Sequence, residues 1–536
     1  MLSYFNLSDT LKLHFRSWVP RWLSIVIALV ILMPILLLNG AYTGSNIDIA
    51  GFLGVISEDI NMAYYASAAG MAIAQLFILK TRTLATTKTI IIVVIFVQIV
   101  LSLVCALTSY IEILIFCSFF IGFFKAFSMS EVINILMPAF SPSKTRNEFY
   151  AKFYPITIGV GQLSLVLTAE FAYRYQWQHM YYFMIVLLFL ALLLVVICMQ
   201  TSKRLIKISF SDIDWLSFFQ VSVVIMAIIY VLTYGKTNDW FASNNIIFAT
   251  VLILVVGWMF IRRQLILAKP FADLSVLKNR NSRVVYLFSL VFMFFASFSI
   301  LTSSYVNNIL KLDSVKANEL YLYTLPGLVV GGFISYYWYL KAIRMAWLIF
   351  LGFACFTVAI GILYFRIEPM GLYSDMYLPM FFKGVGMLTL FVAFGVYAVE
   401  GLPPEKLIPN AFYIITARSV LGPALGSSIL TNWLYRLQQK NNMVLSESIT
   451  TQNPLAVSQY NQSLKTALSQ GFGMQDAEKI ATNALYAKVQ VQSMTVSIKA
   501  ILGWMLILSI ILLVVILLYF FKFKPVKLIK VGRDLH

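Results

Sequence analysis

Long apolar stretches recur along the whole chain, and they limit what it can fold into more than any other feature. A helix rises about 1.5 Å per residue, so about 20 apolar residues are needed to cross the roughly 30 Å hydrocarbon core of a bilayer. The sequence therefore predicts a polytopic, all-α integral membrane protein with fourteen spanning helices. The predicted spans cover residues 22–41, 61–79, 89–110, 113–137, 153–173, 180–199, 215–234, 246–261, 284–306, 320–340, 345–365, 376–399, 408–434 and 501–521.

The composition leaves lipid as the solvent for most of the surface. Of the 536 residues, 60% are hydrophobic and only 12% are charged. Soluble domains carry roughly 25% charged residues, so this chain cannot build a fully water-exposed surface. The net charge of +18 could point to nucleic acid, but the basic residues are spread among the segments that connect the predicted helices. We therefore expect no nucleic-acid partner.

The basic residues also predict how the chain crosses the membrane. If the N-terminus lies in the cytoplasm, most Lys and Arg residues fall in connecting segments on the cytoplasmic side. The short outer segments then hold only Arg174, Lys236, Lys311, Lys316 and Arg366. An excess of Lys and Arg is typical of cytoplasmic loops, where the cations lie beside anionic lipid headgroups. We expect a multi-pass protein of a bacterial cytoplasmic (inner) membrane, with both N- and C-termini in the cytoplasm.

The predicted spans fall into groups of six, two and six. We expect an N-terminal six-helix bundle in residues 1–200, two linking transmembrane helices and a cytoplasmic loop in 201–282, and a C-terminal six-helix bundle in 283–536. A long periplasmic loop is predicted at about 436–499, with an amphipathic helix at 476–489. Long loops without structure are uncommon in compact domains, so we expect this one to have a role.

Four local motifs accompany this arrangement. KPFADLSVLKNRNSR follows the eighth predicted span, and the fifth ends in YRYQWQHMYYF. The thirteenth span begins in LPPEKLIPNAFYIITARSVLGPALGSSI, and GSNIDIAGFLGVISEDI follows the first. In this order they resemble motifs of the major facilitator superfamily, and specifically of its fourteen-helix drug:proton antiporter branch (EmrB/QacA type). Arg418 stands in the place of the branch's arginine in the thirteenth helix, with Gly422 and Gly426 near its glycines.

The resemblance implies the major facilitator fold, with two six-helix bundles plus two extra central helices, and transport by alternating access. It also implies export of a small amphipathic molecule, coupling to protons and, for many members, a periplasmic adaptor protein as partner. Three places depart from the branch. The loop after the second span is basic but lacks the family's aspartate, Ser118 stands in the place of a coupling arginine, and SLVLTA at 164–169 stands in the place of the signature G-P-x-x-G-G.

Ionisable side chains inside the predicted spans are functional candidates, because a charge in lipid is costly unless it is paired. Lys125 and Glu131 lie six residues apart in the fourth span, about 120° around the helix, and cannot pair with each other. A buried pair with another helix is the structural alternative for each of them. We predict Glu131 as the leading proton-coupling residue, and the following as substrate-cavity residues: Lys125, Asn134, Lys383 and Arg418.

The sequence FFIG at 119–122 and the sequence FFKG at 381–384 hint at an internal relation between the fourth and twelfth spans. Transporters bind substrate near the midplane at such a repeat interface, so two lysines there would favour an anionic or zwitterionic substrate. The alternative for Lys383 is contact with the outer headgroups, and the alternative for Arg418 is helix packing against a carboxylate.

Two carboxylates near the outer face are further proton-coupling candidates. Asp48 is either a residue of a solvated loop or a proton entry site. Glu170 lies four residues before Arg174, a spacing that favours a simple ion pair on the helix surface.

The leading hypothesis is a secondary active transporter that exports amphipathic small molecules, with protons as the coupling ion. One alternative is a docking subunit of a tripartite efflux assembly, with the segment 436–499 contacting a periplasmic adaptor protein. Another is an uptake transporter of an anionic or zwitterionic substrate. His14, His179 and His536 have no zinc-ligand spacing, and there is no nucleotide-binding or catalytic motif. We therefore expect no enzyme activity, no cofactor and no metal.

Overall fold

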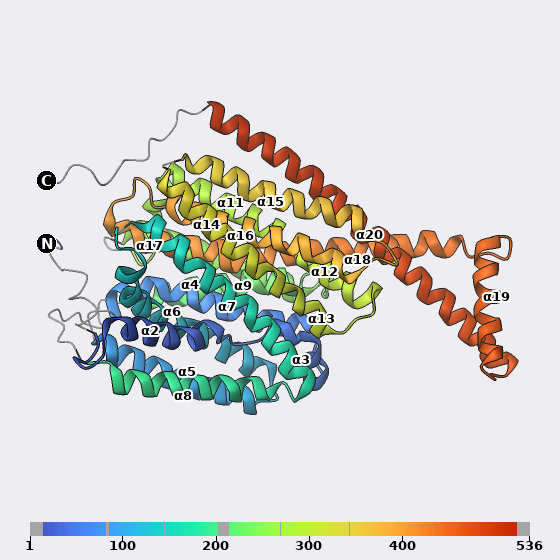
Figure 1. Ribbon diagram of the computed structural model, residues 1–536, viewed down its shortest axis with the longest axis horizontal. Helices are drawn as coiled ribbons and strands as arrows, with labels where there is room; N and C mark the ends of the chain where they lie inside the picture. The colour runs from blue at the N-terminus through green and yellow to red at the C-terminus, as the bar shows by residue number, and fades with distance from the viewer. Residues whose placement is uncertain are drawn as a thin grey trace.

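The computed structural model describes residues 14–81, 85–143, 145–201, 214–267, 270–341 and 343–522. Its helices run roughly parallel or antiparallel to one another and form an elongated body (Figure 1). Eleven helices of the described chain are long and apolar enough to cross a membrane, and α2 (Arg21–Leu37) is a shorter apolar helix. Each of the predicted spans coincides with a helix or a run of helices. The predicted all-α membrane fold is therefore confirmed.

The N-terminal half holds the first six spans around one hydrophobic core that draws on residues between Phe15 and Met199. A 3-10 turn η1 (Thr43–Ser45) and the short helix α3 (Asn46–Leu53) lead from the first span to the second. After α2, the remaining spans of this half are α4 (Ser57–Thr81), α5 (Thr87–Leu107), α6 (Ile111–Phe140), α7 (Arg146–Arg174) and α8 (Gln178–Cys198).

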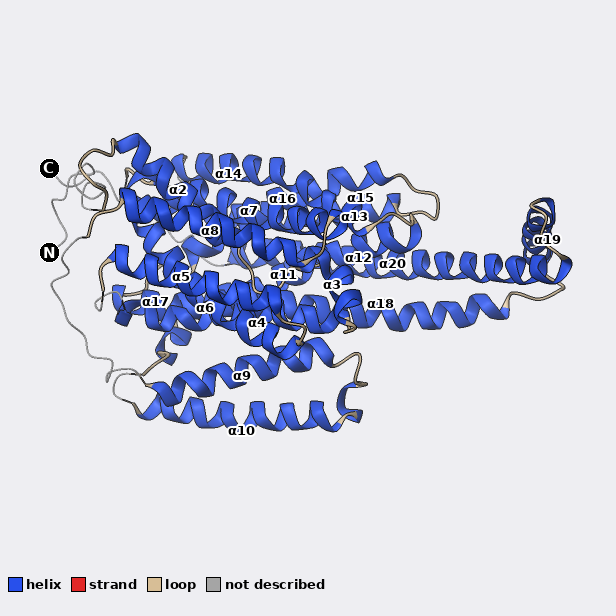
Figure 2. Ribbon diagram, turned by 90° about the horizontal axis from the view of Figure 1, so that it is seen from below, coloured by secondary structure: helices blue, strands red, loops and turns tan. Residues whose placement is uncertain are grey.

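Helices α9 (Trp215–Tyr234) and α10 (Asn244–Ile266), joined through η3 (Trp240–Ala242), pack against each other at the edge of the body (Figure 2). A polar network holds one end of this pair. Asp214 accepts hydrogen bonds from Arg263 at 2.9 and 3.0 Å, and Gln264 accepts one from the amide of Ala272 at 2.9 Å. The last bond fixes the segment that contains the FADL motif to α10. The motif thus has a structural role in joining the extra helices to the following half.

The C-terminal half begins with η4 (Leu274–Lys278) and has a second hydrophobic core, drawn mainly from residues between Val285 and Ile516. Several of its spans are interrupted. Its helices are α11 (Arg280–Ala296), α12 (Ser299–Ser304), the π-helical η5 (Tyr305–Ile309), α13 (Ser314–Glu319), η6 (Leu320–Tyr323), α14 (Thr324–Leu340), α15 (Met345–Arg366), η7 (Tyr373–Met376), α16 (Tyr377–Tyr397), η8 (Pro404–Lys406), α17 (Leu407–Ile415), the π-helical η9 (Thr416–Leu421), α18 (Gly422–Glu447), α19 (Pro454–Ser469) and α20 (Met474–Lys522).

The two halves repeat one glycine-mediated helix contact. In the N-terminal half, a Cβ on Gly122 of α6 would lie 1.8 Å from the carbonyl oxygen of Ser67 in α4. In the C-terminal half, a Cβ on Gly384 of α16 would lie 2.2 Å from the carbonyl oxygen of Thr324 in α14. Small residues allow such close approach of helices in membranes. The same contact at matched positions supports the internal relation that FFIG and FFKG suggest.

The segment 436–499, predicted as a long connection between the last two spans, is largely helical. Helices α18 and α20 continue beyond the body and carry α19 between them at the far end, which we call the stalk (Figures 1 and 2). Asn441 donates to Ser497 at 2.9 Å, and Ser493 donates to the carbonyl of Gln438 at 2.9 Å, so the two long helices contact each other at the base of the stalk. Farther out they diverge, and α19 lies between their ends (Figure 1). No glycine or proline interrupts either long helix within the stalk, so both continue without a break. The chain turns after Glu447 and again after Ser469. The predicted amphipathic helix 476–489 lies within α20.

The first span is broken, which the sequence did not predict. Helix α2 ends at Leu37, and Leu38 begins a non-helical stretch that lasts until η1. Non-helical backbone at membrane depth is tolerated only where protein or a water-filled cavity covers it. Here Ser164 donates to the carbonyl of Leu37 at 3.3 Å and Tyr181 to that of Gly40 at 2.7 Å. A Cβ on Gly40 would lie 2.2 Å from that of Ser118. Two departures from the family motifs, Ser118 and Ser164, therefore lie against this break.

Candidate functional site

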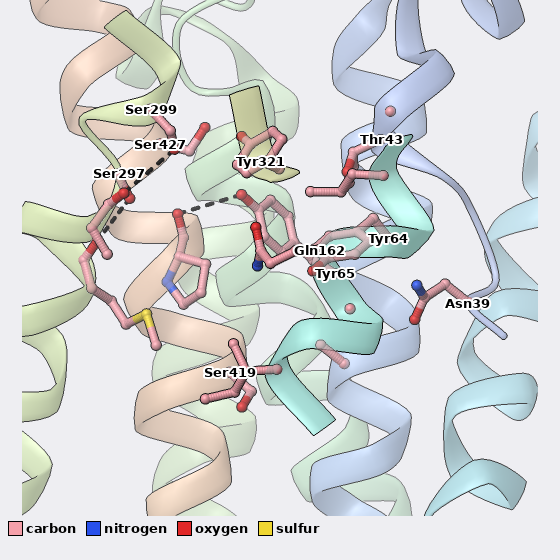
Figure 3. A pocket seen from close by; sticks show the side chains of 18 of the residues that line it. Asn39, Thr43, Tyr64, Tyr65, Gln162, Ser297, Ser299, Tyr321, Ser419 and Ser427 are labelled. Atoms are coloured by element: carbon pink, nitrogen blue, oxygen red, sulfur yellow. Dashed lines mark hydrogen bonds between the residues drawn. The ribbon is translucent and has the colours of Figure 1, made fainter. Parts of the chain in front are cut away.

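A cavity of about 670 Å³ lies between the two halves. This volume is in the range of small-molecule sites, which span about 300–1,000 Å³. The N-terminal half contributes residues from α2, α4, α6 and α7, and the C-terminal half from α11, α13, α16 and α18. Figure 3 shows hydroxyl and amide groups from both halves around it, with Asn39 and Tyr64 on one side and Ser297 and Ser299 on the other. Met129, Met387 and Phe391 add apolar surface.

Three cationic side chains line the cavity: Lys125, Lys383 and Arg418. All three are buried, with 8%, 5% and 8% of their surface exposed. No aspartate or glutamate is among the residues that line it in the described chain. The other polar lining groups are uncharged hydroxyls and amides from both halves. The cationic side chains therefore face no opposite charge among the described lining residues.

Lys125 is held by the break in the first span. Its Nζ donates to the carbonyls of Leu36 at 3.0 Å and Leu38 at 2.7 Å, and to Oδ1 of Asn39 at 3.2 Å. The last carbonyls of a helix have no partner within the helix and carry partial negative charge. The lysine therefore satisfies these carbonyls and places its amino group beside the cavity.

Lys383 has different surroundings. Its Nζ lies 5.5 Å from the ring centre of Phe298 and 5.1 Å from that of Tyr321, within range of cation–π attraction. Within the described chain it has neither a hydrogen-bond acceptor nor an ion-pair partner. The glycine contacts match Gly384 with Gly122, so Lys383 corresponds to Ile121 in the first half. When the two halves are compared at matched positions, Lys125 and Lys383 therefore differ by about one helical turn.

Arg418 lies in the π-helical turn η9, and its guanidinium stacks 4.1 Å from the ring centre of Phe391. Its Nε and Nη1 atoms are buried and have no hydrogen-bond partner among the described residues. Single π-helical turns inside helices occur frequently at functional sites. An unpaired buried guanidinium is costly, and it is a strong donor to a carboxylate, sulfonate or phosphate group. The geometry suits an acidic ligand in the cavity.

The two halves meet at the end of the body from which the stalk projects. Asn318 of α13 donates to the carbonyl of Gly44 in η1 at 2.9 Å, and Ser314 lies 3.5 Å from a carboxylate oxygen of Asp48. We call these two contacts the outer contact. Burial raises the pKa of Asp48, and the Ser314 hydroxyl partly offsets this effect. The two halves also contact each other midway along α14, where Gly332 lies against Pro155 of α7.

Three predicted candidates lie away from the cavity lining. Glu131 is buried and accepts a hydrogen bond from Thr87 at 2.7 Å, within the N-terminal half. Asn134 is exposed and donates to the carbonyl of Ser130 on its own helix at 2.6 Å. Glu170 forms the expected surface ion pair with Arg174. Sequence reasoning missed Asn39, Gln162 and Asn307, which line the cavity. The pair Asn39–Gly40 was a usable signal, because both residues are unfavourable inside an apolar helix.

Comparison with known proteins places this site in context. A colistin resistance protein EmrB of Acinetobacter baumannii is 24% identical over 306 residues, covering 55% of this chain and 57% of that protein. The multidrug export protein EmrB of Escherichia coli is 26% identical over 234 residues, covering 43% and 45%. The predicted resemblance to EmrB-type proteins is confirmed. The matched region spans only about half the length of these EmrB-type relatives, and no protein-family model matches the chain.

Solved structures share the fold. A POT family transporter in complex with 5-aminolevulinic acid has a TM-score of 0.52 at 15% identity, over 79% of this chain and 92% of that one. Tetrameric PepTSo2 has a TM-score of 0.51 at 13% identity, over 90% and 98%. These similarities show that the chain has the fold of these transporters.

Proposed function

We propose that the protein is a secondary active transporter that exports small amphipathic molecules with an acidic group by alternating access. The observation that carries the proposal is the central cavity, in which three buried cationic side chains face no carboxylate among the described lining residues. Methionine and aromatic side chains in the same cavity offer an apolar surface for the rest of the ligand. The relatives named for multidrug export support the direction of transport.

The membrane is a bacterial cytoplasmic membrane in this proposal, and both chain termini lie in the cytoplasm. The support is the distribution of Lys and Arg, which predicts the stalk on the outer side. A reporter fused to the stalk between Gly471 and Gly473 tests the orientation. Alkaline phosphatase, which is active only outside the cytoplasm, should be active there and inactive after α8.

Matched amphiphiles test the charge preference of the cavity. Decanesulfonate and decyltrimethylammonium have the same chain length and opposite permanent charges. Binding to the protein in lipid nanodiscs should favour decanesulfonate by at least about tenfold, since hydrogen bonds to charged groups contribute about 1.5–3 kcal/mol each. Equal affinities for the two amphiphiles, or tighter binding of the cation, would reject an anion-selective cavity.

We further propose that protons drive export and that Asp48 carries the coupling proton. Its carboxylate lies at the outer contact, where the two halves must separate to open the cavity outward. Glu131 is the alternative, because it is buried and belongs to one half only. Asp48→Asn should abolish transport driven by a pH gradient while exchange of substrate across the membrane persists. If Glu131→Gln has this effect and Asp48→Asn does not, the assignment moves to Glu131.

A second candidate function is docking of a periplasmic adaptor protein, and the stalk favours it. The stalk projects beyond the body and exposes apolar side chains at its far end, where Leu455 is 76% and Met474 is 55% exposed. Single exposed apolar residues are common on protein surfaces and carry no argument by themselves. The helical projection that bears them is what suits the docking of an adaptor protein (Figure 2). Replacing residues 454–469 by a short Gly-Ser linker should abolish co-purification of an adaptor and leave decanesulfonate binding intact. Unchanged co-purification would reject the docking role.

A further inference from the structure

The break in the first span creates a cluster of oxygen atoms that point at one spot. The carbonyl oxygens of Leu36 and Leu38 and the amide oxygen of Asn39 lie 3.0, 2.7 and 3.2 Å from Nζ of Lys125. An ammonium group has three N–H donors, and these distances suit N–H···O hydrogen bonds. Within the described chain, Lys125 forms these contacts without a carboxylate partner. Its amino group is therefore surrounded by neutral oxygen atoms that accept its hydrogen bonds.

This arrangement resembles an ion site more than a salt bridge. Discontinuous helices in transporters use the C-terminal ends of half-helices and unwound carbonyls to coordinate monovalent cations. Here the position that a free cation would take is filled by the head group of a side chain on α6. Lys383 provides the contrast, because it is equally buried and faces aromatic rings in place of oxygen atoms.

The oxygen cluster does not depend on Lys125 alone. The carbonyl of Leu37 is held by Ser164 and that of Gly40 by Tyr181, while Gly40 packs against Ser118. None of these contacts involves the side chain of Lys125. The backbone around Leu36 to Asn39 should therefore keep its shape in a Lys125 variant.

We propose that Lys125 is a tethered cation, and that removal of its side chain leaves an oxygen site that binds a free ammonium-type cation. The site lies at the edge of the cavity, since Leu36, Asn39 and Lys125 all line it. In this view Lys125 is a positioning residue that holds the broken span and keeps positive charge at the cavity. The inference concerns the fold of the first span, and only its decanesulfonate readout rests on the proposed function.

Chemical rescue tests this proposal. Lys125→Ala removes the side chain beyond Cβ, and propylammonium is the fragment that is lost. We expect Lys125→Ala to have a lower Tm than the native protein and to gain at least about 2 °C, saturably, as propylammonium chloride is added. Decanesulfonate binding should weaken in this variant and recover over the same concentration range, which a purely structural loss would not do.

The controls separate the site from general effects of salt and amines. 1-Propanol has the size without the charge, and tetramethylammonium has the charge without N–H donors, so neither should rescue Lys125→Ala. Propylammonium should not rescue Lys383→Ala, because the ammonium of Lys383 faces aromatic rings and has no oxygen acceptor within the described chain. Equal rescue of both variants, or of the native protein, would overturn the proposal, as would no rescue of folded Lys125→Ala.

Two further variants keep the proposal testable if Lys125→Ala does not fold. Lys125→Arg keeps a cation with N–H donors, and Lys125→Met keeps a side chain of similar length without charge. We expect the arginine variant to retain most of the native Tm and the methionine variant to lose stability without rescue by propylammonium. A methionine variant as stable as the arginine variant would show that the positive charge is not required, and the proposal would fail.

Discussion

Replacement of Arg418 by methionine is the sharpest test of the cavity's charge. Methionine keeps an unbranched apolar side chain over the ring of Phe391 and removes the guanidinium. In the described part of the chain, Nε and Nη1 of that guanidinium have no hydrogen-bond partner. In the proposed complex these donors face the acidic group of the ligand. Charge-assisted hydrogen bonds contribute about 1.5–3 kcal/mol, and each 1.4 kcal/mol is about tenfold in affinity. Arg418→Met should therefore weaken decanesulfonate binding by about 10-fold to 150-fold.

Equilibrium binding in lipid nanodiscs measures this effect, with decyltrimethylammonium as the matched probe. The cationic probe should bind the variant as well as or better than the native protein, because a repulsive charge has been removed. Arg418→Lys should give an intermediate loss, since an ammonium keeps the charge but cannot stack as a plane on Phe391. Equal weakening of both probes would indicate a general loss of structure and would refute the reasoning, as would unchanged decanesulfonate binding.

Three further predictions test the fold and the outer contact. Gly122→Ala should lower the free energy of unfolding by about 3 kcal/mol or more in a denaturation assay, because the new Cβ would lie 1.8 Å from the carbonyl oxygen of Ser67. Gly51→Ala is the control and should change this free energy little, because the space around Gly51 is open. Burial raises the pKa of Asp48 in the closed outer contact above the ordinary value of 3.8 that an exposed aspartate has in an open state. Protonation of Asp48 therefore favours closure. This contribution to closure is complete below the ordinary pKa and is lost as the pH rises through the raised pKa. Spin labels at positions 51 and 312 should show this shift in distance populations, and Asp48→Asn should remove it. Glu170→Gln should leave substrate flux within about twofold of native, because an exposed ion pair contributes at most about 1 kcal/mol; a larger loss would restore Glu170 as a coupling candidate.

The spans could be predicted from the sequence because lipid imposes a strict length and polarity on each helix. Hydropathy misses the break after Leu37, because it averages over residues 38–41, and only the pair Asn39–Gly40 disfavours a helix there. The partners that satisfy the carbonyls of the break come from distant helices and could not be predicted. The helical stalk was predicted as a loop because a polar segment gives no hydropathy signal, although it lacks glycine and proline over most of its length.

Residue spacing alone predicts which candidate residues share a helix face. Lys125 and Asn134 are nine residues apart, which is about 180° around a helix at about 100° per residue, so the opposite orientation of Asn134 was available from the sequence. By the same geometry Glu131 lies on a different face from Lys125. The absence of lining carboxylates in the described cavity could not be predicted, because it depends on which faces of eight or more elements converge.

The central claim is that this cavity serves the transport of acidic amphiphiles, and flux in proteoliposomes tests it most directly. Vesicles with an acidic lumen should accumulate decanesulfonate against its gradient as protons leave, and they should accumulate decyltrimethylammonium far less. Decanesulfonate stays ionised at every pH used, so passive trapping of a weak acid cannot produce this result. Accumulation that is the same in protein-free vesicles, or that occurs for the cation and not for the anion, would contradict the account.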